Sequence, residues 1–199
     1  MLTADELRAF EQDIVADFNA GKIRAPVHMA GGNEDALIEI FKDIAPNDWV
    51  LGSWRSHYHC LLKGVPRETV RDAILRGRSI ALTFPAHRVL CTAIVGGVAP
   101  IAVGLAWAIK RRGSTARVHV FMGDMTANCG IVAEAQLYAH GFGLPINWIV
   151  EDNKLSVGTV TLDAWGNDQM AASPDGPEHL AYEYTLPHAH VGTGKWVPF

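Results

Sequence analysis

The 199-residue sequence has few cysteines and no excess of basic residues. The three cysteines, Cys60, Cys91 and Cys129, are an odd number, and no two of them have C-x-x-C spacing. This pattern argues against a disulfide framework and favours a reducing compartment, so we expect a cytoplasmic protein. The net charge is −4, with Lys and Arg scattered along the chain, and offers no basic stripe for a phosphate backbone. No nucleic-acid partner is expected.

Charge is also absent from one long segment, residues 89–109, which is long enough to span a bilayer. Gly96-Gly97 and Pro100 interrupt it, and this break predicts a buried strand end, a tight turn and a buried helix instead. We therefore expect no membrane contact. The N-terminal stretch MLTADELRAFEQDIVADF, with Thr3 as cap and Glu6 three residues later, predicts an amphipathic helix and no signal peptide.

The clearest periodicity lies between residues 100 and 152. It predicts a helix over 100–112, a β-branched strand over 117–122, a helix over 131–140 and a strand over 146–150. Short connections make this a parallel βαβ crossover whose apolar strands are covered on both faces. The expected fold class is therefore α/β, with a parallel sheet and helices on both faces.

The flanking regions are less regular. Residues 33–76 look helical in pieces, whereas the chain beyond residue 160 looks like loop with one or two short strands near its end. No internal repeat, low-complexity tract or linker appears, so we expect residues 1–199 to form a single domain.

Polar residues follow both strands of the predicted crossover. Asp124 comes at the end of the first strand, and Asn153 follows the second. Neighbouring strands lie about 5 Å apart, and ligands of parallel sheets bind at the carboxyl ends of the strands. Two side-chain oxygens and a nearby carbonyl suit Mg²⁺, which takes its remaining ligands from water or phosphate. The pattern predicts a metal-bound diphosphate at this edge.

The stretch GDMTANCGIVAEAQLYAHGFGLPINWIVEDNKLSVGT resembles the thiamin diphosphate motif of the α subunits of 2-oxo acid dehydrogenase E1 components. Asp124 and Asn153 are 29 residues apart, within the roughly thirty of that motif. IVGGVAPIAVGLAWAIK, WRSHYH and IRAPVHMAGGNEDA match further stretches of the family in the same order, so the resemblance extends from about residue 21 to residue 160.

The resemblance implies a role for each matching position. The metal ligands would be the side chains of Asp124 and Asn153 and the carbonyl of Leu155. Arg55 would hold the diphosphate, and His28 and His57 would face the reacting end of the cofactor as acid/base or substrate-orienting groups. The full set of implied cofactor-binding residues is Trp54, Arg55, Gly97, Ala99, Gly123, Asp124, Met125, Thr126 and Asn153, in which Gly97 and Ala99 contact the aminopyrimidine through the main chain.

Three positions depart from the family pattern. Met125 replaces the second glycine of the motif, so the turn there has to avoid positive φ or shift. Trp54 replaces a tyrosine, which removes a hydroxyl that would reach phosphate, and Asp152 replaces the first asparagine of the closing pair. None of these changes removes a metal ligand.

The function that the resemblance implies is that of an α-like subunit of a two-component enzyme acting on a 2-oxo acid with thiamin diphosphate and Mg²⁺. The catalytic glutamate would come from a pyrimidine-binding, E1 β-like partner in an α2β2 assembly, and a lipoyl-bearing protein would be a further partner. The alternatives are a non-oxidative decarboxylase, carboligase or transketolase-like subunit, and a non-catalytic assembly subunit that retains the fold.

Structural interpretations stand beside these roles. Asp124 alone would be read as a helix cap, Arg55 as a surface ion-pair residue and His28 as a structural histidine. Two H-x-H pairs, His57 with His59 and His188 with His190, would place both imidazoles on one face if they lay on strands, and would then suit zinc. Cys129 at a helix start is either a thiol of lowered pKa or a small packing residue.

Overall fold

The computed structural model describes residues 2–166 and 179–197. A six-stranded sheet has the order β2-β3-β1-β4-β5-β8, and its central strands are parallel. The strands of this sheet are β1 (Trp49–Gly52), β2 (Thr83–Phe84), β3 (Val89–Cys91), β4 (Val118–Gly123), β5 (Ile146–Asp152) and β8 (His179–Glu183). The short strands β6 (Leu155–Ser156) and β7 (Thr159–Val160) pair with each other as a separate hairpin.

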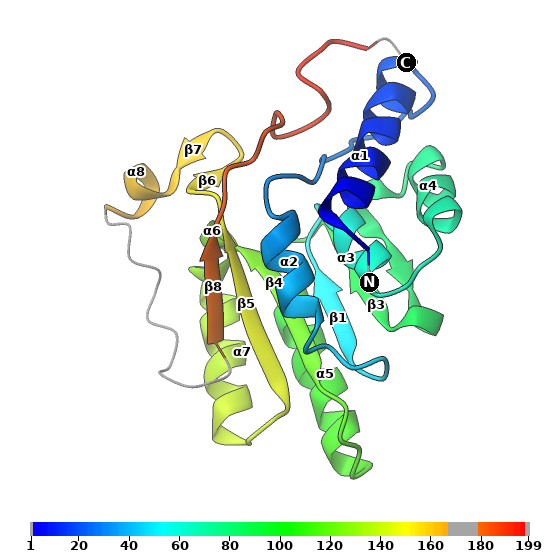
Figure 1. The fold of residues 1–199 in the computed structure, drawn as a ribbon. Coiled ribbons are helices and arrows are strands. Elements are labelled where there is room, and N and C mark those ends of the chain that lie inside the picture. Colours follow the sequence, from blue (N-terminus) through cyan, green and yellow to red (C-terminus); the bar gives the residue numbers. More distant parts are fainter. Residues whose placement is uncertain (1, 167–178, 198–199) are drawn as a thin grey trace.

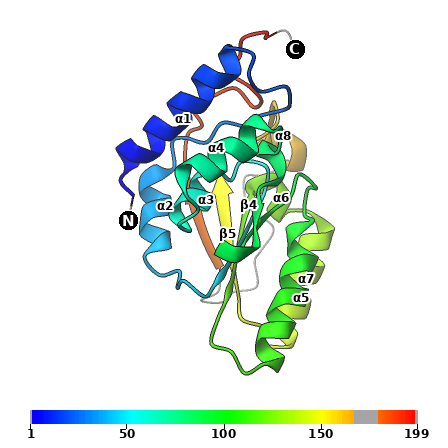
Figure 2. The same cartoon turned by 90° about the vertical axis from the view of Figure 1, so that its right-hand side faces the viewer.

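Helices cover both faces of the sheet (Figures 1 and 2). They are α1 (Ala4–Asn19), α2 (Glu34–Phe41), α3 (His57–Leu62), α4 (Arg67–Leu75), α5 (Val98–Arg111), α6 (Asp124–Ala127), α7 (Gly130–Gly141) and α8 (Thr161–Trp165), with 3₁₀ turns at Ser79–Ala81 and Pro85–His87. The predicted α/β class, the βαβ crossover and the capping box of Thr3 and Glu6 are confirmed.

Side-chain alternation along the strands gives each face its own core. On β4 and β5, Val120 and Trp148 point to the layer of α5 and α7, whereas Phe121 and Ile149 point to the layer of α1–α4. All four are essentially inaccessible to solvent. Burial on both faces explains why these strands are apolar throughout rather than alternating.

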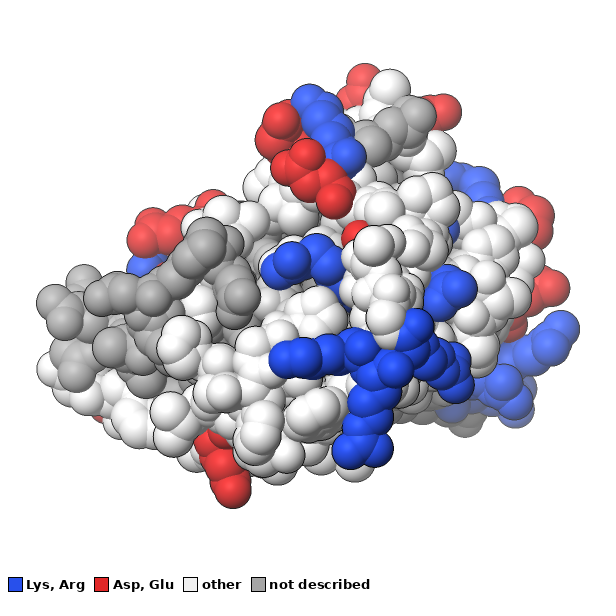
Figure 3. Space-filling view, turned by 90° about the horizontal axis from the view of Figure 1, so that it is seen from below, with Lys and Arg blue, Asp and Glu red and all other residues white. Residues whose placement is uncertain are grey.

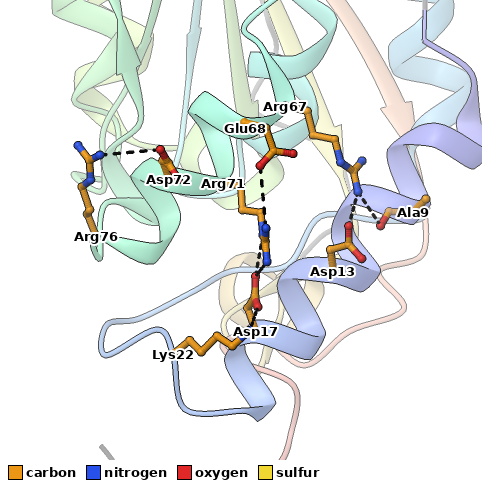
Figure 4. A network of polar contacts seen from close by, with 9 residues as sticks. All are labelled: Ala9, Asp13, Asp17, Lys22, Arg67, Glu68, Arg71, Asp72 and Arg76. Atoms are coloured by element: carbon orange, nitrogen blue, oxygen red, sulfur yellow. Dashed lines mark hydrogen bonds and ion pairs between the residues drawn. The ribbon is translucent and has the colours of Figure 1, made fainter.

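Ion pairs connect α1 with α4 on the outer surface of the layer formed by helices α1–α4 (Figure 4). Asp17 is buried and accepts hydrogen bonds of 2.8 Å from both Lys22 and Arg71, and Arg67 reaches Asp13 one turn earlier. Because Asp17 is hidden from solvent, its two cationic partners replace the water that the carboxylate loses on folding. These contacts fix the position of α1 across the layer.

The segment from residue 89 to 109 forms β3, a turn and α5, as predicted. No helix in the described part of the chain is both long enough and apolar enough to cross a membrane. The C-terminal end of α5 lies at the lower end of the molecule, and seen from below this face displays a group of Lys and Arg side chains (Figures 1 and 3). Lys110 and Arg111 in the last turn are favourable partners for the negative end of the helix dipole.

The helical pieces predicted within residues 33–76 are confirmed as α2, α3 and α4. The sequence did not predict β1, which lies between α2 and α3 and pairs with β3 and β4 in the middle of the sheet. The H-x-H pairs are not on strands: His57 and His59 lie in α3, and residues 188 and 190 follow β8 without regular structure. Most of the loop expected after residue 160 falls at 167–178, outside the described residues, but its beginning is wrong, because Thr161–Trp165 form the short helix α8.

Candidate active site

A cavity of about 110 Å³ lies where the parallel strands β1, β4, β5 and β8 end. Figure 1 shows α6 and the β6–β7 hairpin at this end of the sheet. Each of these strands delivers side chains to the cavity from the loop or helix that follows it, as expected for an α/β sheet. The cavity is lined by Asn33, Ser53, Trp54, Arg55, Gly123, Asp124, Met125, Thr126, Glu151, Asn153, Leu155, Ser156, Val157, Tyr184, Leu186, His188 and His190.

The predicted metal ligands Asp124, Asn153 and Leu155 all line this cavity. Asp124 follows β4 and Asn153 follows β5, and the register pairs Gly123 with Glu151 across the two strands. The structure therefore brings together the two ends of the 29-residue interval. The described residues contain no cluster of three or more His, Cys, Asp or Glu arranged for a metal, so the zinc alternative gains no support from them.

Asp124 is the most buried carboxylate of the cavity wall, with 2% of its surface exposed. The Thr161 hydroxyl donates a hydrogen bond to its Oδ2. Burial raises the pKa of Asp124, and the nearby Asp152 acts in the same direction against the Thr161 hydrogen bond. A bound cation would oppose this shift, because it would favour the ionised carboxylate.

Arg55 is oriented by main-chain oxygens. Its Nε donates to the carbonyl of Met29 at 2.9 Å, and its Nη2 donates to the carbonyl of His190 at 3.1 Å. No carboxylate lies within ion-pair distance of Arg55 among the described residues. Its charge is thus available for an anion, and the buried Trp54 Nε1 beside it is a second donor without a hydrogen-bond partner.

The polar groups of this cavity fit the magnesium diphosphate that the sequence predicts. The cavity offers carboxylate, amide and carbonyl oxygens of the kind that Mg²⁺ prefers, from Asp124, Asn153 and Leu155. It also offers phosphate oxygens a guanidinium that has no carboxylate partner among the described residues, from Arg55, and an indole N–H without a hydrogen-bond partner, from Trp54. Met125 lies in α6 without positive φ, so the loss of the motif's second glycine leaves the turn unstrained.

His28 lies beside the cavity rather than in its wall. Its ring packs at 4.7 Å from the ring of His190 and at 5.7 Å from that of Trp54, measured between centroids. Its Nδ1 lies 2.7 Å from the His190 carbonyl, which can only accept, so Nδ1 carries the proton. Burial, with the charge of Arg55, lowers the pKa of His28 to about 4, and the ring is neutral at pH 7.

The structure does not bring His57 to the cavity. It is fully buried in α3, with Nδ1 at 3.0 Å from Glu11 Oε1 and Nε2 at 2.8 Å from Ser79 Oγ. Both ring nitrogens are thus occupied by protein groups that do not line the cavity. The arrangement gives His57 a structural role here, and its catalytic role stays a prediction.

Gly97 and Ala99 also lie outside the cavity wall. Gly97 caps α5, and Ala99 is fully buried in its first turn, after the carboxyl end of β3. A side chain at Gly97 would approach Ile94 to 3.1 Å, so the tight turn requires a small residue here. Their main-chain contact with an aminopyrimidine stays a prediction.

The segment after β8 forms a wall of the cavity that the sequence did not predict. Tyr184, Leu186, His188 and His190 all line the cavity, and we call residues 184–190 the wall segment. Their spacing of two is that of an extended chain with one face toward the cavity. This alternation is visible in the sequence, but nothing in the sequence says which face meets the site.

Gly31 and Gly32 pack directly against the wall segment, and we call these two glycines its seat. A Cβ at Gly32 would lie 2.0 Å from the Thr185 carbonyl oxygen, and one at Gly31 would lie 2.9 Å from Pro187. Beyond the wall, the Gly192 N–H donates to the Val27 carbonyl at 2.7 Å. Figure 1 shows this part of the chain running from the end of β8 toward the C-terminal end of α1.

This site places the chain among α/β proteins whose ligand binds at the carboxyl ends of parallel strands. Comparison with known proteins makes the assignment specific: the model of the dehydrogenase E1 component family matches residues 3–177, and the chain belongs to this family.

Among curated relatives, the α subunit of the pyruvate dehydrogenase E1 component from Rickettsia prowazekii is 32% identical over 163 residues, covering 77% of this chain and 50% of that protein. The α subunit of acetoin:2,6-dichlorophenolindophenol oxidoreductase from Cupriavidus necator is 28% identical, with 77% and 49% covered. The chain thus spans about half the length of these relatives. A solved enzyme from Mycobacterium smegmatis, described as thiamin diphosphate-dependent, aligns over 66% of this chain and 22% of its own, with 22% identity and a TM-score of 0.44.

Proposed function

We propose that this chain is the α-like, diphosphate-binding subunit of a thiamin diphosphate-dependent enzyme acting on a 2-oxo acid. The observation that supports it most is the meeting of Asp124, Asn153 and Arg55 in one cavity at the carboxyl ends of β1, β4 and β5. Membership of the E1 component family adds the cofactor chemistry that such a cavity would serve.

Five residues of the cavity wall have a defined task in this proposal. Asp124, Asn153 and the Leu155 carbonyl would hold Mg²⁺, and Arg55 and Trp54 would bind the diphosphate. The bound cofactor supplies a carbon nucleophile and an electron sink for decarboxylation. The wall segment would line the bound cofactor on the side of β8.

His28 would provide a neutral hydrogen-bonding group beside the cavity. Because Nδ1 donates to the His190 carbonyl, Nε2 is the ring atom left to accept a proton or a hydrogen bond. A neutral ring with a free Nε2 fits the base or substrate-orienting part of the role predicted for His28, because a general acid would have to carry the proton that it donates.

A partner subunit is part of the proposal. Apolar side chains next to the cavity are open to solvent: Leu155 is 43% exposed and Val157 62%, and Leu162 and Trp165 follow close behind in the chain. A group of exposed apolar side chains marks an interaction surface more often than it marks free surface. We propose an E1 β-like, pyrimidine-binding subunit in an α2β2 assembly in the cytoplasm, with a lipoyl-bearing protein as the acceptor.

Calorimetric titration of the chain with thiamin diphosphate and Mg²⁺, alone and with the co-expressed partner, tests the binding. The variant Asp124→Ala should lose more than about 100-fold in Mg²⁺ affinity, since even changes to outer-shell groups cost 10–100-fold. Asp43→Ala, at an exposed carboxylate just after α2 and outside this cavity, is the control and should bind as the wild type does. If the wild type fails to bind with the partner present, the chain is an assembly subunit.

The reaction is tested separately. With the partner, decarboxylation of a 2-oxo acid should reduce an artificial electron acceptor, and the chain alone should be inactive. Formation of aldehyde or hydroxyketone without reduction of the acceptor would instead identify a decarboxylase or carboligase. Full turnover by the chain alone would contradict the two-subunit proposal.

A further inference from the structure

The Asn33 side chain has a buried oxygen without a partner. Asn33 is 7% exposed and lines the cavity, and its Oδ1 accepts no hydrogen bond from any described residue. A buried acceptor left unpaired costs about 1–3 kcal/mol. Such a group inside a binding cavity indicates a ligand that would pair with it.

The orientation of this amide is fixed by its neighbours. Asn33 Nδ2 lies 3.2 Å from Glu151 Oε1 and 3.0 Å from the Tyr182 hydroxyl oxygen. Tyr182 donates its own proton to Glu151 Oε1 at 2.5 Å, so its oxygen is the acceptor for Asn33. A carboxylate can only accept, and therefore the NH₂ group must face this pair. The amide cannot be flipped to pair Oδ1 here.

The carboxylate of Glu151, which orients Asn33, has a buried histidine as a further neighbour. His59 Nε2, fully buried in α3, lies 3.3 Å from Glu151 Oε1. The same Oε1 accepts the hydrogen bonds of Tyr182 and of Asn33 Nδ2, so Glu151 presents an acceptor toward Asn33.

The Asn33 side chain also does not cap the helix that it precedes. It occupies the N-cap of α2, where an asparagine oxygen ordinarily accepts from a backbone N–H of the first turn. No such hydrogen bond forms, because the side chain is turned toward Glu151 and Tyr182 instead. Its Oδ1 is therefore free for a hydrogen-bond donor.

The donor must come from the ligand. If the cavity holds a magnesium diphosphate, the phosphate oxygens only accept, whereas Mg²⁺ ordinarily keeps several water molecules that donate strongly. We propose that Asn33 is a further binding residue of this site, whose Oδ1 accepts a hydrogen bond from a water molecule on the magnesium ion. This inference rests on the proposed function of the cavity.

The test compares Asn33→Leu with Asn147→Leu in the full chain, with the partner present. Asn147 makes side-chain hydrogen bonds at the other end of the sheet, to Arg117 and His119, and undergoes the same chemical change outside the cavity. Calorimetry should show a Mg²⁺ dissociation constant, at saturating thiamin diphosphate, raised about tenfold or more by Asn33→Leu and unchanged by Asn147→Leu. Tyr182→Phe, which removes one orienting group, should raise it by a smaller factor.

Thermal unfolding without ligand provides the readout that separates binding from folding. Asn33→Leu should keep a cooperative transition, and the stabilisation that Mg²⁺ and cofactor add should shrink. Wild-type binding together with unchanged Mg²⁺ affinity in Asn33→Leu would overturn this inference alone. Absence of binding by the wild type would overturn the proposed function and this inference with it.

Discussion

The two H-x-H pairs of this chain have the same sequence signature and opposite surroundings. His57 and His59 lie in α3, and both are fully or almost fully buried. His57 contacts the carboxylate of Glu11, and His59 contacts that of Glu151. His188 and His190 lie in the wall segment and face the cavity. A histidine therefore becomes a packing residue or a site residue according to the element that holds it, which neither its type nor its spacing reveals.

The sharpest test of this contrast is His57→Leu. It leaves Glu11 buried without its partner, so the free energy of unfolding should fall by about 3–5 kcal/mol in urea titration. His140→Leu, at an exposed position in α7, should change it by less than about 0.5 kcal/mol. Unchanged stability with lost activity in His57→Leu would instead return His57 to the catalytic residues.

The seat of the wall segment provides the next test. Gly32→Ala places a methyl group 2.0 Å from the Thr185 carbonyl oxygen at a φ of +84°, so we expect a loss of at least about 3 kcal/mol and weaker cofactor binding. Gly64→Ala has nearly the same backbone strain, at +85°, but open space around the new atom, and should cost only about 1–2 kcal/mol. Equal losses in the two variants would show that the seat contributes nothing beyond its backbone conformation.

In the other H-x-H pair, His188 and His190, the variant His190→Leu should weaken cofactor binding and leave the free energy of unfolding nearly unchanged. The main-chain carbonyl that anchors Arg55 and His28 remains, so unfolding should change by less than about 1 kcal/mol. The affinity for thiamin diphosphate should fall about five- to tenfold, the equivalent of one hydrogen bond. The contrast between the pairs fails if His190→Leu destabilises the fold as much as His57→Leu does.

The last test is a pH dependence from His28. Its folded pKa of about 4 lies below the ordinary 6.5, so the unfolded chain binds the proton more readily. Its contribution to stability is complete above pH 6.5 and is lost as the pH falls toward 4. His28→Asn keeps a donor for the His190 carbonyl without titrating. The thermal stability of the wild type should therefore drop more steeply than that of His28→Asn between pH 6.5 and 4; parallel curves would contradict the shift.

The parts of the fold that could be predicted are those with strong local patterns. The crossover from α5 to β5 has long apolar runs, clear glycine stops and polar residues at its strand ends, and its boundaries differ from the prediction by only one or two residues at most ends. β1 was missed because four residues between helical stretches are too few to show a period. Its central place in the sheet comes from pairing with β3 and β4, which is non-local.

In the candidate site, too, some residues could be predicted from local sequence patterns and others could not. Asp124 and Asn153 could be paired from the sequence because one crossover separates them, and Trp54 and Arg55 because they matched a family motif. Asn33 and the wall segment could not be found, since their place at the cavity depends on contacts between distant parts of the chain. His57 matched a motif too, yet the packing of α1 against α3 encloses it.

The hydrogen bond between His28 and the His190 carbonyl joins positions 162 residues apart, and that between Asn33 and Tyr182 spans 149. A nascent chain therefore has no complete pocket until the segment through residue 190 has left the ribosome, because segments far apart in the sequence build the pocket together. A ligand that recognises the finished pocket would select fully folded molecules, and its binding would stabilise the whole chain against unfolding rather than one loop.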